Sequence, residues 1–162
     1  MHLQNVIAQG ILFFSQLWEN FWGLTELFML KDIPKLVVEN IIVAIVPEEN
    51  EIAEQIWNVY LVNLYDAKIE GVLVSSKGYG SRNGEDVKTS TLRHFIGTVE
   101  PKDYAKIELI IKDVFGLSNE YWISFYLGKD MYDKKYVFLP ESITEENMTL
   151  IPILNKRGVM IR

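Results

Sequence analysis

The stretch EYWISFYLGKDMYDKKYVFL, residues 120–139, decides the fold. Residues 120–127 and 135–139 are rich in aromatic and branched side chains, which favour strands, and they flank a turn-forming tripeptide at 128–130. The stretch therefore predicts a long antiparallel hairpin. We expect its aromatic side chains to pack into a core. Because both faces of these strands carry aromatics, an exposed stripe that binds a partner is the alternative.

The rest of residues 31–162 shows the same pattern, in which short apolar runs are separated by turn residues. Asn83-Gly84 is the strongest turn signal, because both residue types tolerate a positive φ. We expect 57–63 and 69–76 to pair as a hairpin and 47–51 to be a solvated acidic break. Further strands are expected at 36–46, 87–96, 104–111, 150–154 and 158–161. About eight short strands without a βαβ rhythm predict an all-β domain, an antiparallel β-sandwich of the immunoglobulin-like type.

The segment 104–111 shows the clearest alternation of polar and apolar residues. Such a period of two is typical of a strand that places one face on a core. The residues predicted to face the core are Ala105, Ile107, Leu109 and Ile111. The residues predicted to face outward are Tyr104, Lys106 and Glu108.

Residues 1–30 differ from this body, because they are nearly uncharged and apolar with a helical period. Their apolar residues fall on one half of a helical wheel, which predicts an amphipathic helix before the sandwich. Such a helix packs on a sheet or a second chain, or binds a membrane surface through Trp18, Phe21, Trp22 and Phe28. Alternatively, Met29 is the true start and 1–28 are upstream sequence. A bilayer-spanning helix and a signal peptide fit less well.

Composition limits the chemistry that the chain can carry. It has 162 residues, of which 49% are hydrophobic, a net charge of −6, two histidines and no cysteine. The length suits one sizeable core. Without cysteine there is no disulfide framework and no thiolate site, and we expect no cofactor and no metal. The negative charge argues against general nucleic-acid binding, although 77–106 carries six Lys or Arg residues against four Asp or Glu residues.

Motifs for catalysis or nucleotide binding are weak in this chain. The glycines at 78, 80 and 84 miss the dinucleotide fingerprint by one residue and lead into a strand. Ser90 and His94 would lie about 13 Å apart on one strand face, too far for a nucleophile–base hydrogen bond. His94 is therefore expected to be a half-buried strand residue. The candidate partner-binding residues come from the glycine-rich region and the aromatic hairpin, and they are Tyr79, Arg82, Lys88, Arg93, His94, Tyr126 and Tyr132.

Six segments carry a resemblance to a known family: GVLVSSKGYG (71–80), KTSTLRHF (88–95), VFGL (114–117), EYW (120–122), YDKKY (132–136) and KRGVMI (156–161). Together they resemble small proteins of the Bacteroidetes lineage that often bear the label "phenylalanyl-tRNA synthetase alpha subunit". The resemblance covers 31–162 and leaves out the N-terminal helix. A class II synthetase catalytic domain is far larger and uses arginine-bearing motifs that this chain lacks. The resemblance therefore implies an RNA- or nucleotide-linked role but no catalytic residue.

The leading functional hypothesis is a non-enzymatic interaction module in the cytoplasm. It would bind another protein through the aromatic hairpin or the loop at 78–84. An RNA- or nucleotide-linked accessory role is the alternative, and it requires the six basic residues of 77–106 to converge on one face. A third hypothesis is a peripheral membrane protein anchored through residues 1–30. Catalysis is least favoured, because no pair of titratable groups has a workable spacing.

Overall fold

The computed structural model describes residues 36–162, of which 37–162 form one compact unit. The predicted helix at 1–30 and the alternative start at Met29 lie outside the described residues. The described part holds ten strands and two short 3-10 helices: β1 Ile41–Glu49, β2 Gln55–Asn63, β3 Ile69–Arg82, β4 Glu85–Lys88, β5 Leu92–Val99, β6 Asp103–Ile110, η1 Lys112–Val114, β7 Ser118–Leu127, β8 Asp130–Phe138, η2 Glu145–Asn147, β9 Thr149–Ile151 and β10 Lys156–Ile161. Within residues 36–162, no helix reaches the length and apolarity that crossing a bilayer requires.

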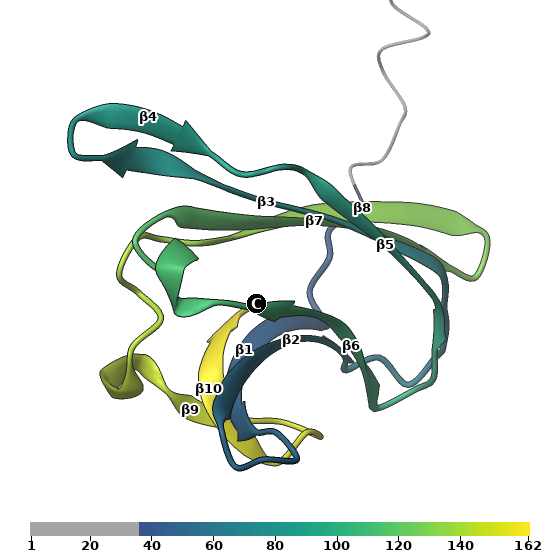
Figure 1. The fold of residues 1–162 in the computed structure, drawn as a ribbon. Helices are drawn as coiled ribbons and strands as arrows, with labels where there is room; N and C mark the ends of the chain where they lie inside the picture. The colour runs from purple at the N-terminus through teal and green to yellow at the C-terminus, as the bar shows by residue number, and fades with distance from the viewer. Residues whose placement is uncertain (1–35) are drawn as a thin grey trace, which may run out of the picture. The chain divides into compact units, whose positions relative to one another are not determined.

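The strands form two antiparallel sheets that face each other (Figure 1). The first sheet has the order β6-β2-β1-β10-β9, and the second has the order β4-β3-β7-β8, with β5 also paired to β3. Because β3 is 14 residues long, one of its sides accommodates both β5, along 69–76, and β4, along 79–82. The prediction of an all-β antiparallel sandwich is confirmed.

The predicted hairpin of residues 120–139 is also confirmed. β7 and β8 pair from Asn119 opposite Phe138 to Leu127 opposite Asp130. Gly128, in the turn between them, has a φ of +64°, a backbone conformation that glycine adopts without strain. The aromatic side chains divide between the two faces of the hairpin. One face packs into the main core between the sheets through Tyr121, Phe125, Tyr136 and Phe138. The other face exposes Trp122 and Tyr126.

A second, smaller core covers the opposite face of the first sheet, and it consists of Ile42, Ala44, Val46, Tyr60, Val62, Ile151 and Leu154. β1 is therefore buried on both faces along its first six residues, which explains the unbroken apolar run in its sequence. β1 begins at Ile41 instead of residue 36 and runs to Glu49. The predicted acidic break is thus wrong for 47–49, because the Glu48 carboxylate is held by neighbouring side chains.

The predicted hairpin between 57–63 and 69–76 is wrong. β2 pairs with β1 and β6, whereas β3 belongs to the second sheet. The connection between them crosses from one sheet to the other and is held by the buried side chain of Asn63. Its amide nitrogen donates hydrogen bonds to the carbonyl oxygens of Ala67 (2.9 Å) and Glu100 (2.9 Å), and its amide oxygen accepts one from the Tyr65 N–H (3.0 Å). These hydrogen bonds stabilise the connection between the two sheets, although its sequence resembles that of a hairpin turn.

The single strand predicted at 87–96 is divided into β4 and β5. The break lies at Thr89, whose N–H donates to the Gly78 carbonyl (2.9 Å) and whose hydroxyl accepts from the Gly78 N–H (2.8 Å). The Asn83-Gly84 turn is confirmed between β3 and β4, with φ values of +55° and +81°. Positive φ at both residues is the geometry of a type I′ turn, whose twist suits a hairpin.

Candidate functional site

The outer face of the second sheet, which points away from the core, carries a continuous group of exposed hydrophobic side chains. Leu73 on β3 lies beside Phe95 on β5 and beside Ser124 on β7. Trp122 and Tyr126 flank Ser124 on the same face, and Met131 on β8 lies opposite Tyr126. All five hydrophobic residues are exposed, Phe95 most of all at 76%. We call this group the apolar patch; it consists of Leu73, Phe95, Trp122, Tyr126 and Met131.

Charged side chains border the apolar patch. Glu120 is buried, with 6% of its surface exposed. Its carboxylate forms ion pairs with the ammonium groups of Lys77 (N···O distance 3.1 Å) and Lys135 (3.6 Å). The Lys135 ammonium also lies 5.1 Å from the centre of the Trp122 ring, which fixes one side of that ring. Arg93, next to Phe95 on the same face of β5, is exposed. Charged side chains therefore border the apolar patch, while its hydrophobic side chains remain exposed to solvent.

The structure brings together four of the seven predicted partner-binding residues. Tyr79, Lys88, Arg93 and Tyr126 all lie on the outer face of the second sheet, since Lys88 lies opposite Tyr79 and Arg93 lies opposite Ser75. The face holds further exposed residues that were not predicted to bind, namely Leu73, Phe95, Trp122 and Met131. Strand alternation places Trp122 and Tyr126 on one face of β7, but it does not indicate which face is exposed.

The other three predicted residues lie elsewhere. Arg82 donates a hydrogen bond to the Asp113 carbonyl in η1 (2.5 Å). Tyr132 stacks on Phe125, with ring centres 5.5 Å apart, and packs against the main core. His94 points between the sheets, where its Nε2 lies 2.9 Å from a carboxylate oxygen of Glu108. These three side chains belong to internal contacts of the sandwich.

The six basic residues of 77–106 do not converge on one face. Lys77, Lys88 and Arg93 share the outer face of the second sheet. Arg82 is bonded to η1. Lys102 contacts the Leu64 carbonyl and the Asp66 carboxylate at the turn between β5 and β6. Lys106 lies opposite Tyr60 in the first sheet. The condition set above for an RNA-linked role is therefore not met.

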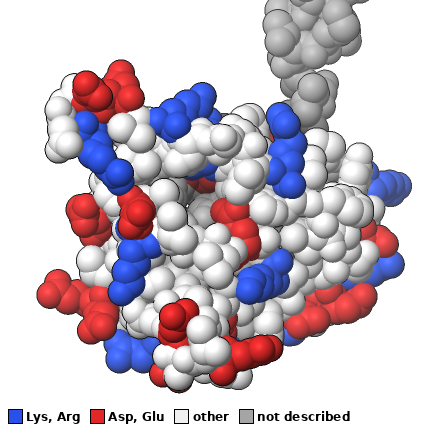
Figure 2. Space-filling model, in the orientation of Figure 1, with Lys and Arg blue, Asp and Glu red and all other residues white. Residues whose placement is uncertain are grey.

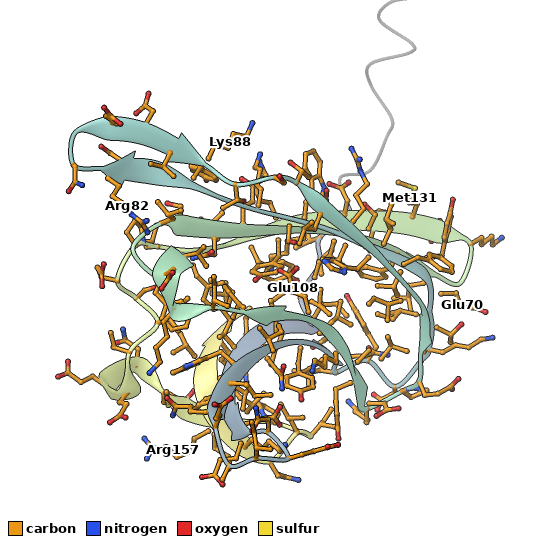
Figure 3. The ribbon with its side chains drawn as sticks, in the orientation of Figure 1. Glu70, Arg82, Lys88, Glu108, Met131 and Arg157 are labelled. Carbon is orange, nitrogen blue, oxygen red and sulfur yellow. The ribbon has the colours of Figure 1, made fainter. Side chains whose placement is uncertain are left out.

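A β-bulge in β6 changes the direction of Glu108. Val59 lies opposite Glu108, but the next residue, Tyr60, lies opposite Lys106, so Ile107 is an extra residue in β6. The predicted alternation of 104–111 is therefore wrong after this point: Ile110 is buried, whereas Leu109 and Ile111 are exposed. Glu108 turns into the space between the sheets instead of facing outward (Figure 3). Bulges at sheet edges commonly redirect a side chain in this way.

The redirected Glu108 carboxylate connects the two sheets. Its Oε2 accepts a hydrogen bond from the Ser76 hydroxyl on β3 (3.1 Å) and lies 2.9 Å from the Nε2 of His94 on β5. Burial, together with the charge of Glu108, raises the pKa of the neighbouring Tyr121 hydroxyl, so this phenol stays neutral. Nothing in the alternating sequence indicated this cluster, because it depends on the bulge.

A second carboxylate cluster lies at the far end of β1. Glu48 accepts hydrogen bonds from the Tyr60 hydroxyl (2.7 Å), the Asn58 amide and the Lys156 ammonium. Burial alone would raise the pKa of Glu48, but the hydrogen bonds from Lys156, Asn58 and Tyr60 outweigh it and lower the pKa overall. Among the described residues, no group of three or more acidic or histidine side chains is placed to hold a metal ion.

Replacing Glu48 by glutamine is expected to lower the free energy of unfolding by about 1.5–3 kcal/mol at pH 7, the usual contribution of hydrogen bonds to a charged group. The lowered pKa means that the contribution of Glu48 is fully present above its ordinary pKa of 4.5. It is lost as the pH falls through the lower pKa of the folded protein. Denaturant titrations of both proteins from pH 7 to pH 3 should therefore show a difference that shrinks with acid. A difference that is the same at all pH values would contradict the assignment.

No protein-family model, curated protein or solved structure matches the chain. Two features of residues 36–162 remain as candidates for function. One is the apolar patch on the outer face of the second sheet. The other is the Glu108 cluster between the sheets.

Proposed function

We propose that this chain is a non-enzymatic β-sandwich module that binds another protein through the apolar patch. The observation that carries the proposal is the patch itself, five large hydrophobic side chains from four strands on one solvent-facing surface. In soluble proteins, a continuous exposed hydrophobic surface marks an interaction site. Tyrosine, tryptophan, phenylalanine and methionine are also the residue types that protein interfaces favour. A chain without cysteine suits a reducing compartment, so we place this module in the cytoplasm.

The strand order supports an immunoglobulin-like type for the sandwich. In that fold the first, second, fourth and fifth strands share one sheet, and the third, sixth and seventh share the other, to which variable-type domains add strands. β4 and β5 lie along one side of β3, so they correspond to such added strands and not to the fourth strand. The remaining orders, β1-β2-β6 and β3-β7-β8, then follow that scheme. β9 and β10 are an addition beside β1.

Two of the sheet edges are poorer candidates than the face for binding a partner. β8, at one edge of the second sheet, carries two aspartates and two lysines in nine residues. β9, at one edge of the first sheet, has only three residues. Charged and very short edge strands oppose the addition of a further strand. The outer face of the second sheet therefore offers a more favourable contact than either of these two edges.

The charges beside the apolar patch indicate the chemistry of the partner. Lys77 and Lys135 share the single carboxylate of Glu120, so these three side chains together keep a net positive charge. Arg93 and Lys88 are exposed on β5 and β4, on the side of the face that lies beyond β3. We therefore propose a partner protein that presents an apolar surface next to carboxylates. Complementary charge would orient that partner on the patch.

Arg93→Glu and Trp122→Ala are expected to abolish partner capture without loss of stability, because Trp122 is exposed on the patch and Arg93 is exposed beside it. Surface changes of this kind usually alter the free energy of unfolding by less than about 0.5 kcal/mol. Capture is measured in cells with a photo-cross-linking phenylalanine analogue in place of Phe95. We expect a discrete cross-linked protein from position 95, which disappears in either variant.

The matched control carries the same analogue in place of Leu150, an exposed residue of β9 in the first sheet. We expect no discrete product from position 150. Equal products from positions 95 and 150 would overturn the proposal. So would a product from position 95 that survives both Arg93→Glu and Trp122→Ala.

A further inference from the structure

A cavity of about 340 Å³ opens between the sheets, beside Glu108. It lies where β6 and the link between β4 and β5 diverge. The stick view labels Glu108 there, between the two sheets (Figure 3), and the space-filling view shows the surface hollowed beside an acidic residue (Figure 2). Its volume equals that of about eleven waters at ~30 Å³ each, near the lower end of the range for small-ligand pockets. The cavity can therefore hold a short side chain or a small molecule.

Aliphatic side chains form the mouth of the cavity and part of its wall. Leu92, Leu109 and Ile111 border it and are each about half exposed, while Ile110 and Val114 lie deeper. The exposure of Leu109 and Ile111 follows from the same bulge that turns Glu108 inward. One irregularity in β6 thus creates both the apolar mouth and the charged wall.

Three other polar side chains of the wall, those of Asn119, Thr89 and Lys77, are already bonded within the protein. The Asn119 amide nitrogen donates to the carbonyl oxygens of Val114 (2.9 Å) and Leu117 (3.0 Å). Thr89 is bonded to Gly78, and Lys77 is paired with Glu120. These groups shape the cavity but have little capacity left for a ligand.

Among the described residues, Glu108 is the only acidic one in the wall of the cavity. Its hydrogen bonds from Ser76 and with His94 both fall on Oε2, so Oε1 receives neither of these two, and the Tyr121 hydroxyl is a further hydrogen-bonding neighbour of the carboxylate. Lys77 also borders the cavity, but its ammonium group lies on the outer face of the second sheet, where it is paired with Glu120. A carboxylate in a partly buried apolar setting binds a cationic donor more strongly than a neutral one. Anionic ligands are disfavoured for the same reason.

We propose that this cavity binds an alkyl chain that ends in an ammonium group, with the chain between Leu92, Leu109 and Ile111 and the ammonium on Oε1 of Glu108. A lysine side chain and a free short alkylamine share this chemistry. The site is separate from the apolar patch, which lies on the outer face of the second sheet. The inference therefore does not depend on the proposed partner binding.

The test uses the full chain and three ligands of equal length: n-hexylammonium, 1-hexanol and hexanoate. Binding is followed by NMR through the methyl signals of Ile110 and Ile111. We expect saturable binding of hexylammonium with a dissociation constant of about 1 mM, a value suited to a ligand of this size. We expect 1-hexanol to bind at least about ten-fold more weakly and hexanoate not at all. Equal binding of the amine and the alcohol would overturn the proposal.

Amino-acid substitutions test whether hexylammonium binds in this cavity. Glu108→Gln should weaken hexylammonium binding at least about ten-fold, which corresponds to one charge-assisted contact. The matched control, Glu146→Gln in η2, changes an exposed carboxylate and should leave binding unaltered. If Glu108→Gln does not fold, Leu92→Lys provides the same test, because it brings a tethered ammonium to the mouth of the cavity and should compete with the ligand. Unchanged binding in Leu92→Lys or in a folded Glu108→Gln would overturn the proposal.

A fourth ligand separates the two sources of the ammonium group. Nα-acetyl-lysinamide carries the same ammonium on a peptide backbone, and its Nε-acetylated form serves as the neutral control. Binding of the lysine derivative at least as tight as that of hexylammonium assigns the cavity to a lysine side chain of a peptide. Tighter binding of hexylammonium assigns it to a free amine. Binding of the Nε-acetylated form as tight as that of the charged form would overturn the ammonium assignment.

Discussion

Replacing Phe125 by alanine is expected to lower the free energy of unfolding by about 3–5 kcal/mol, the usual cost of removing a buried phenylalanine ring. Phe125 is 1% exposed and lies in the main core. Its ring stacks on that of Tyr132 at 5.5 Å, with an angle of 8° between the planes. The lost ring would leave a cavity between two strands of the central hairpin. Since domains of this size are stable by about 5–15 kcal/mol, the variant would be close to unfolding.

The matched control is Phe95→Ala, the same substitution on the outer face of the second sheet. Phe95 is 76% exposed, so its replacement should change the free energy of unfolding by less than about 0.5 kcal/mol. Urea titration of both variants measures the difference, and equal denaturant slopes show that the two-state comparison holds. Losses of similar size in the two variants would contradict the division of this sheet into a core face and an exposed face.

Replacing Gly158 by alanine is expected to cost about 3 kcal/mol, at the upper end of the range for overpacking a core. A Cβ at this position of β10 would lie 2.5 Å from the Ile45 carbonyl oxygen and 2.9 Å from a methyl carbon of Val46. The first of these atoms belongs to the backbone of β1, so it cannot move without disturbing the pairing of β1 with β10. The added methyl group would therefore push two neighbouring strands apart.

Gly116→Ala is the matched control for this second substitution. A Cβ at Gly116 would lie 3.1 Å from Oε1 of Glu141, the end of a flexible side chain that can rotate away. We expect a change of less than about 0.5 kcal/mol there. Thermal unfolding, with hydrogen exchange at the amides of β1 and β10, measures both variants. Equal melting temperatures for Gly158→Ala and the natural chain would show that β10 does not pack this closely against β1.

The local pattern of the chain was sufficient to predict the central hairpin and its neighbouring turn. β7 and β8 follow from residues 120–139 alone, and the turn between β3 and β4 follows from Asn83-Gly84. A hairpin depends on residues that are close in the chain, so short-range sequence carries the necessary information. The crossover after Asn63 shows the limit of this reasoning. Its hydrogen bonds reach Glu100 in a distant segment, which no local pattern indicates.

The candidate surface was only partly predictable. Sequence pointed to Arg93 and Tyr126 because cations and aromatics on a strand are typical of interfaces. It did not indicate which face of β7 would be covered, since Tyr121 and Trp122 on opposite faces are both aromatic. The first sheet decides this point, because it buries the face of Tyr121 and leaves that of Trp122 in solvent.

The amino-acid sequence by itself determined that residues 36–162 form short antiparallel strands, because a period of two and turn residues are properties of neighbouring positions. The tertiary structure alone decided which sheet each strand joins and where Glu108 points. The bulge at Ile107 arises only when β6 pairs with β2, a strand far earlier in the chain. The bulge shifts the register of β6 against β2 by one residue. In a strand, such a shift transfers every following side chain to the opposite face. For this reason the sequence indicated only Tyr126 of the apolar patch, and it gave no sign of the cavity beside Glu108.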